Sequence, residues 1–135
     1  MNNIKLVNQR SDNDCVLACV AMVANVSYED AFKAFEGYEA PYSDISLARA
    51  LLRLGLWYDI GNLKMGIRGE TYLVTVPSLN IKAVNHCIVL QLDEKGWGKI
   101  FDPQNGRANK LFYKNYTECL GVSGFERIEY FGKTF

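Results

Sequence analysis

The feature that most constrains the fold is a run of apolar residues, Val16 to Ala24, that contains no polar side chain. A surface helix would show polar residues every three or four positions, whereas this run favours a helix buried on nearly all sides. The run is too short to cross a bilayer. Asp12, Asn13 and Asp14 precede it and are all plausible N-cap residues. We therefore predict a buried central helix whose first turn carries Cys15.

The composition provides enough apolar material for a core. The 135 residues are 49% hydrophobic and 13% aromatic, which argues against disorder and suits one domain over residues 1–135. Fifteen basic residues balance fifteen acidic ones without a basic cluster of the kind that binds nucleic acid. Asp12 and Asp14 precede the apolar run, where a signal peptide carries positive charge. We expect a cytoplasmic protein with no membrane span and no nucleic-acid partner, and the oligomeric state stays open.

Two further helices are expected in the first half of the chain. The segment Ser27 to Asp30 resembles a capping box before a helix near residues 28–36, which Gly37 ends. Another helix covers residues 43–55, with Gly55 as its C-cap. Its expected core-facing residues are Ile45, Leu47, Ala48, Leu51, Leu52 and Leu54.

Beyond residue 70 the pattern changes from that of helices to that of strands. Four segments rich in β-branched and aromatic residues predict strands at 71–76, 85–92, 98–102 and 125–131. Residues 110–120 are ambiguous, and we favour a short helix or turn from about Lys114. Helices followed by strands indicate the α+β class, with the helices packed on an antiparallel sheet.

A hairpin turn is predicted at residues 93–96, between the second and third of these strands. If the loop has three residues and Gly96 is left-handed, Asp102 faces Ile88 across the pair. His86 and Asp102 then become diagonal neighbours on one face, within side-chain reach. A two-residue loop would place them on opposite faces. His86 is the single histidine of the sequence, so any chemistry that needs an imidazole depends on it.

The four cysteines are expected to be free thiols, because a core-rich chain of this size needs no disulfides. A zinc site from Cys15, Cys19, His86 and Cys87 is disfavoured, since adjacent strand residues point to opposite faces. We expect no metal and no cofactor. Cys19 is expected in the core. Cys15 is either a buried thiol or a nucleophile. The second role is possible because the positive end of the helix dipole favours the thiolate form of a cysteine in the first turn.

Three short motifs occur in an order and spacing typical of one enzyme family. They are Gln9-Arg-Ser-Asp-Asn-Asp14-Cys15, His86-Cys-Ile-Val-Leu90 and Ile100-Phe-Asp102-Pro103-Gln-Asn-Gly106. Together they resemble the papain-like cysteine peptidases, specifically the double-glycine-leader (bacteriocin-processing) peptidase domains of ABC exporters. The three helices expected between the cysteine and the histidine agree with this resemblance.

The resemblance implies a papain-like fold in which a central Cys-bearing helix packs on a C-terminal antiparallel sheet. It implies that Cys15 is the nucleophile and His86 its general base. Asp102 would orient the imidazole, and Gln9 would donate to the oxyanion together with the Cys15 backbone N–H. The chemistry suits these residues, because a thiol paired with an imidazole is a strong nucleophile at neutral pH. The implied partner is a peptide or protein substrate.

One departure from the family pattern leaves a second hypothesis open. Val16 and Leu17 follow the cysteine, where the family has glycine and then small residues. Their bulk beside Cys15 fits a catalytically inactive papain-like protein that binds a peptide or protein partner in its cleft. The sequence contains no transmembrane or nucleotide-binding part of an exporter, so we expect any peptidase to be free-standing.

Overall fold

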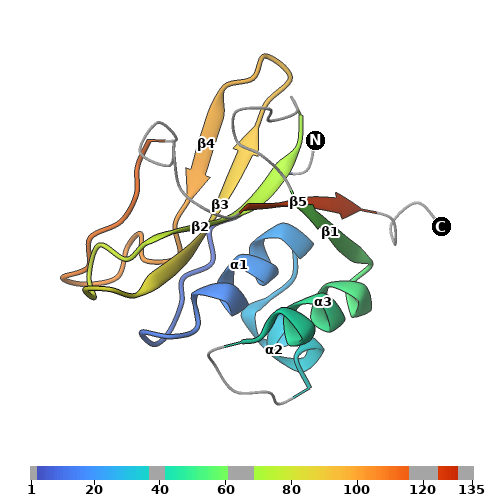
Figure 1. The fold of residues 1–135 in the computed structure, drawn as a ribbon, viewed down its shortest axis with the longest axis horizontal. Helices are drawn as coiled ribbons and strands as arrows, with labels where there is room; N and C mark the ends of the chain where they lie inside the picture. Colours follow the sequence, from blue (N-terminus) through green and yellow to red (C-terminus); the bar gives the residue numbers. More distant parts are fainter. Residues whose placement is uncertain (1–2, 37–41, 61–68, 116–124, 131–135) are drawn as a thin grey trace.

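Helices occupy the first part of the chain and strands the rest, as the sequence predicts. The computed structural model describes residues 3–36, 42–60, 69–115 and 125–130. Three helices lie together on one side of a five-stranded sheet (Figure 1). The helices are α1 (Cys15–Ala24), α2 (Tyr28–Ala34) and α3 (Asp44–Arg53), and the strands are β1 (Leu56–Ile60), β2 (Thr71–Pro77), β3 (Asn85–Leu92), β4 (Gly98–Phe101) and β5 (Phe125–Tyr130).

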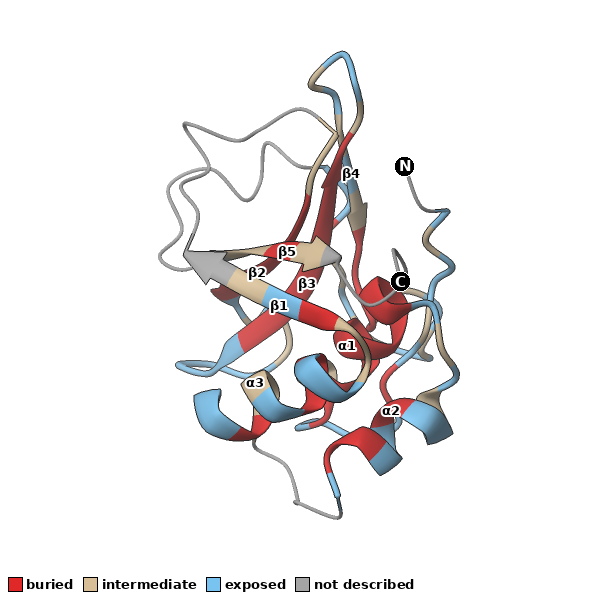
Figure 2. Ribbon diagram, turned by 90° about the vertical axis from the view of Figure 1, so that its right-hand side faces the viewer, coloured by how far each residue is buried: buried red, intermediate tan, exposed pale blue. Residues whose placement is uncertain are grey.

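The central helix α1 is buried almost completely, which confirms the prediction from its apolar run. Every residue from Leu17 to Ala24 is at most 3% exposed, and Figure 2 shows the helix surrounded by the sheet and the other two helices. The helix runs from Cys15 to Ala24 and is capped by Asn25, whose backbone is left-handed (φ 56°) and whose N–H donates to Ala21 O and Met22 O. Because no face is polar, burial on all sides is what stabilises this helix.

The two shorter helices begin at serine caps. The Ser27 hydroxyl accepts from Asp30 N at the start of α2, and the Ser43 hydroxyl accepts from Ser46 N at the start of α3. On α3 the predicted core face is wrong at Ile45 and Leu52, which are 68% and 49% exposed. A helix at the side of a layer buries only the stripe that faces its neighbours, and six residues cover too much of the circumference. The observed stripe contains Ser46, Ala50 and Leu51.

The sheet has the strand order β1-β5-β2-β3-β4, and every neighbouring pair is antiparallel. Of the two hairpin registers that the sequence left open, the structure has the one of the three-residue loop: β3 and β4 pair Val89 with Phe101, and Gly96 is left-handed with φ 86°. The carboxylate of Asp93 accepts from Lys95 N and Trp97 N, which closes the turn.

The predicted strands agree with β2, β3, β4 and β5 to within one residue at each end. Strand β1 was not predicted. It follows α3 directly after Gly55, and it pairs with β5 far along the chain, so no local turn signal marks it. Residues 110–115 have no regular structure, and the rest of the ambiguous segment and Gly37 lie outside the described residues.

In the described ranges, no single helix has both the length and the apolar character needed to span a membrane. Among the described helices, one pair, α1 and α2, meets those criteria when taken together, and the two are bent by 105° at their junction.

Candidate active site

Cys15 is the first residue of α1 and is only partly buried, whereas the residues after Val16 are enclosed. The backbone N–H groups in the first turn of a helix have no partner within the helix, and they make its N-terminus positive. A thiol at this position therefore lies where a negative charge is favoured.

His86 and Asp102 form a buried pair at the end of the β3–β4 hairpin. His86 is the second residue of β3, Asp102 comes directly after β4, and His86 Nε2 lies 2.7 Å from Asp102 Oδ1. Their side chains are 8% and 1% exposed. The Asp102 carboxylate also accepts from Gln104 N (2.9 Å) and Tyr113 N (2.8 Å), so it is held on both oxygens.

The imidazole of His86 connects Asp102 to Cys15. Burial opposes protonation of His86, but hydrogen bonds to Asp102 and to the Cys15 side chain, with the negative charges of both, raise its pKa to about 9. Because Asp102 contacts Nε2, Nδ1 is the ring nitrogen that remains for the thiol. The structure therefore brings together three of the four residues singled out in the sequence.

The fourth residue, Gln9, is 2% exposed and lies between the Cys15 loop and the turn after Asp102. Its backbone N–H donates to Pro103 O (3.1 Å), and its side-chain Nε2 donates to Ser11 O (2.8 Å). One further N–H of the amide group is left, because an amide nitrogen carries two. No described residue donates to its buried Oε1 atom.

Two residues hold the loop from Gln9 to Cys15 in place, and neither of them was identified from the sequence. Arg107 donates to Ser11 O (3.1 Å) and to Gln104 Oε1 (2.8 Å), and it thereby links the loop to the turn after Asp102. Tyr28 donates to Asp14 Oδ2 from the first turn of α2. No periodic pattern signals either contact, because each joins an irregular loop to a distant segment.

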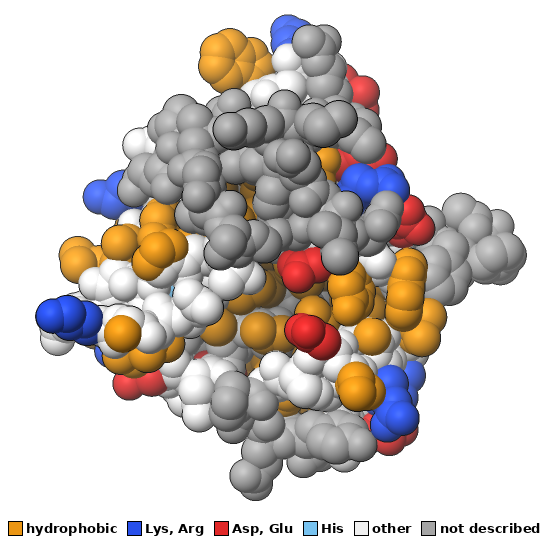
Figure 3. Space-filling model, in the orientation of Figure 1, with side chains coloured by type: hydrophobic (Ala, Val, Ile, Leu, Met, Phe, Trp, Pro, Cys, Tyr) orange, Lys and Arg blue, Asp and Glu red, His pale blue; other side chains and the backbone are white. Residues whose placement is uncertain are grey.

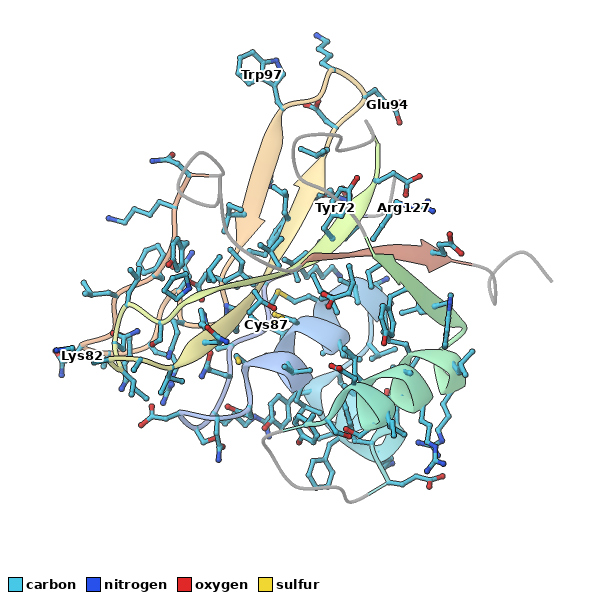
Figure 4. All side chains as sticks on the ribbon, viewed as in Figure 1. Tyr72, Lys82, Cys87, Glu94, Trp97 and Arg127 are labelled. Atoms are coloured by element: carbon cyan, nitrogen blue, oxygen red, sulfur yellow. The ribbon has the colours of Figure 1, made fainter. Side chains whose placement is uncertain are left out.

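The residues beside Cys15 on α1 differ in where they lie. Leu17 is fully buried in the core and Val16 is partly buried against it. Cys19 is also fully buried, as predicted, and its thiol donates to Cys87 O (3.3 Å) where β3 passes over α1 (Figure 4). Burial, and then the hydrogen bond with Cys87, raise the pKa of Cys19 well above its ordinary value. Cys19 is therefore an unreactive thiol at neutral pH.

The described residues around Cys15 and His86 do not form a metal site. Within the described ranges, no three or more His, Cys, Asp or Glu side chains are grouped so that they could hold a metal ion. On the face in Figure 3, basic and acidic side chains are scattered among hydrophobic ones rather than gathered into one charged patch.

Two solved structures resemble this chain over nearly its whole length. The peptidase domain of Streptococcus ComA, a bifunctional ABC transporter involved in quorum sensing, matches with a TM-score of 0.63 and 16% identity, covering 96% of this chain and 98% of the other. A double-glycine-motif protease from an AMS/PCAT transporter, solved with its leader peptide, matches with a TM-score of 0.63 and 15% identity, covering 96% and 92%. The chain has the fold of these peptidase domains. No protein-family model and no curated protein matches the sequence.

Proposed function

We propose that this protein is a cysteine peptidase in which Cys15 is the nucleophile, His86 the general base and Asp102 the residue that orients the imidazole. The observation that carries the proposal is the buried imidazole of His86, which bonds to Asp102 and whose pKa is raised by Asp102 and by the neighbouring Cys15 side chain. A cysteine that only packs in a core gains nothing from a neighbouring histidine–carboxylate pair, whereas a nucleophilic cysteine is activated by one.

The proposed reaction follows from this geometry. The Cys15 thiolate attacks the scissile carbonyl, and the resulting oxyanion accepts from Cys15 N–H and from the free N–H of Gln9 Nε2. Protonated His86 then gives its proton to the departing amine, which leaves a thioester between Cys15 and the acyl part of the substrate. A water molecule, deprotonated by His86, attacks the thioester and forms a second tetrahedral intermediate. Collapse of this intermediate releases the carboxylic acid and restores the thiolate–imidazolium pair.

The substrate class we propose is a peptide with a double-glycine leader. The support is the likeness of the fold to a double-glycine-motif protease whose structure contains the leader peptide. A reducing, cytoplasmic setting suits the reaction, because the nucleophile has to stay free of disulfides. The described cysteines, Cys15, Cys19 and Cys87, are free thiols.

The competing hypothesis is a non-catalytic binding protein that keeps this fold. Of the two bulky residues that motivate it, Leu17 turns into the core and cannot obstruct a substrate, so Val16 is the one that remains. Val16 is half-buried next to Cys15, so its exposed part is the single observation in favour of a blocked site.

The proposal predicts that Cys15 is by far the most reactive thiol of the chain. At neutral pH, iodoacetamide should alkylate Cys15 on the order of ten times faster or more than Cys19, Cys87 or Cys119, as measured by mass spectrometry of peptides. Replacing His86 with alanine should remove this selectivity, since the imidazole holds the thiolate. Denatured protein, in which all four thiols are equivalent, is the control. Equal labelling in the native protein would contradict the proposal.

The pH dependence of hydrolysis gives a second test. The pKa of folded His86 is raised from 6.5 to about 9, so the imidazolium is present through neutral pH and is lost as the pH rises through about 9. We expect kcat to fall above pH 9, because the departing amine then lacks its proton donor. Alkylation of Cys15 by iodoacetamide should not fall over the same interval, because the thiolate persists. A kcat that already falls near pH 6.5 would show that His86 lacks these contacts.

A further inference from the structure

Asp14 occupies the N-cap position of α1 but does not cap the helix. An N-cap side chain normally accepts from the second or third N–H of the helix, whereas Asp14 makes no such hydrogen bond. The residue is 4% exposed, and its carboxylate instead turns back toward the preceding residues. Burying a charged carboxylate is costly unless hydrogen bonds compensate it. Since Asp14 does not bond to its own helix, its partners must lie elsewhere.

The Asp14 carboxylate accepts four hydrogen bonds. Oδ2 accepts from Arg10 N (2.8 Å) and from the Tyr28 hydroxyl (2.5 Å), and Oδ1 accepts from Ser11 N (3.0 Å) and Ser11 Oγ (3.1 Å). Asp14 thus connects the backbone of Arg10 and Ser11 to the start of α1, and the Tyr28 hydroxyl connects Asp14 to α2. Burial raises the pKa of Asp14, but these hydrogen bonds outweigh it and lower the pKa overall, so the group stays ionised.

The loop that Asp14 closes carries both groups proposed to bind the oxyanion. Gln9 lies at one end of it and Cys15 at the other. Asp14 holds Ser11 N–H, and Ser11 O in turn accepts from Gln9 Nε2 at 2.8 Å. A continuous path of hydrogen bonds therefore runs from Asp14 through Ser11 to the Gln9 amide.

We propose that Asp14 is a positioning residue of the proposed peptidase: its carboxylate shapes the Gln9–Cys15 loop so that Gln9 Nε2 and Cys15 N–H converge on the oxyanion. This inference rests on the proposed function. It assigns Asp14 no contact with the substrate and no proton transfer. Its effect falls on the tetrahedral intermediate, because only there does the oxyanion form.

Two reactions of the Cys15 thiolate distinguish a residue that positions the oxyanion donors from one that maintains the thiolate or the fold. Hydrolysis of a peptide passes through an oxyanion, whereas alkylation by iodoacetamide is a displacement at carbon that forms none. A residue that positions the oxyanion donors should therefore affect hydrolysis and spare alkylation. A residue that maintains the thiolate, or the fold as a whole, should affect both.

The test compares Asp14→Asn with the unsubstituted protein in both reactions, with a double-glycine leader peptide as the substrate of hydrolysis. Asparagine keeps the shape but turns an NH₂ group toward donors that now lack an acceptor. We expect kcat to fall by about 10²-fold, in line with the loss of one oxyanion donor, with KM little changed. Alkylation of Cys15 should stay within about twofold, since the His86 pair is untouched.

The chain offers matched controls. Asp12→Asn alters an exposed carboxylate of the same loop, which pairs at the surface with Lys110 (3.2 Å) and Arg107 (3.7 Å), and should change each reaction by less than about twofold. His86→Ala should lower both. In a Gln9→Ala background, Asp14→Asn should cost clearly less than it does alone, because part of its effect acts through Gln9.

Each outcome decides the inference. If Asp14→Asn leaves kcat within about threefold, or lowers alkylation as much as hydrolysis, the positioning role is wrong while the peptidase remains. If the unsubstituted protein cleaves no leader peptide, the proposed function is wrong and the inference falls with it. Should Asp14→Asn not fold, Tyr28→Phe is the substitute variant, because it removes only the hydrogen bond from the Tyr28 hydroxyl to Asp14. An unchanged kcat in that variant overturns the role.

Discussion

Replacing Cys15 with alanine is expected to lower the rate of leader-peptide hydrolysis by about 10⁴-fold or more and to leave the fold intact. The loss is this large because covalent catalysis has no substitute nucleophile at the site. The fold should be unaffected, because Cys15 is only partly buried and alanine is the best helix former at the first position of α1. Steady-state kinetics measures the rate, and circular dichroism with thermal unfolding checks the fold.

Cys19→Ala is the matched control, because it removes the same group one helical turn further along. Cys19 is fully buried and bonds to Cys87 O, so its loss should lower the free energy of unfolding without lowering kcat. A binding protein without catalysis predicts the reverse result for Cys15: the alanine variant would keep the biological effect, and Val16→Trp would abolish it. A Cys15→Ala variant with full biological effect would therefore contradict the peptidase.

The parts of the site that could be predicted from the sequence are those that follow from regular periodicity. A three-residue turn with left-handed Gly96 fixes the register of β3 and β4, and the register places Asp102 beside His86. The absence of polar residues from Val16 to Ala24 fixes α1 as a buried helix, which in turn fixes Cys15 at its partly exposed start. Each step is a local rule applied over a short distance.

The parts that could not be predicted depend on contacts between distant segments. β1 exists because β5 pairs with it, and nothing near Leu56 announces a strand. The exposure of Ile45 depends on which side of α3 the sheet covers. The folding of the Gln9–Cys15 loop depends on Tyr28 from α2 and on Arg107 from the turn after Asp102. Irregular loops carry no period, so their side-chain partners follow only from the assembled fold.

Replacing Asp102 with alanine is expected to damage both stability and activity. The carboxylate is 1% exposed and accepts from His86 Nε2, Gln104 N and Tyr113 N. Its removal leaves those buried donors without an acceptor, so the free energy of unfolding should fall by about 3–5 kcal/mol. Because the imidazole also loses the group that orients it, kcat should fall even where the variant is folded. Urea unfolding and steady-state kinetics measure the two effects.

Asp102→Asn separates orientation from charge. Its side-chain oxygen can still accept from His86 Nε2, so the ring stays in place, while the NH₂ group meets Tyr113 N–H and costs part of the stability. The negative charge is gone, however, and that charge helps to hold the pKa of His86 near 9. The fall in kcat on the alkaline side should therefore move to lower pH than in the unsubstituted protein. If it stays near pH 9, the charge of Asp102 does not maintain the imidazolium, and Cys15 alone would have to do so.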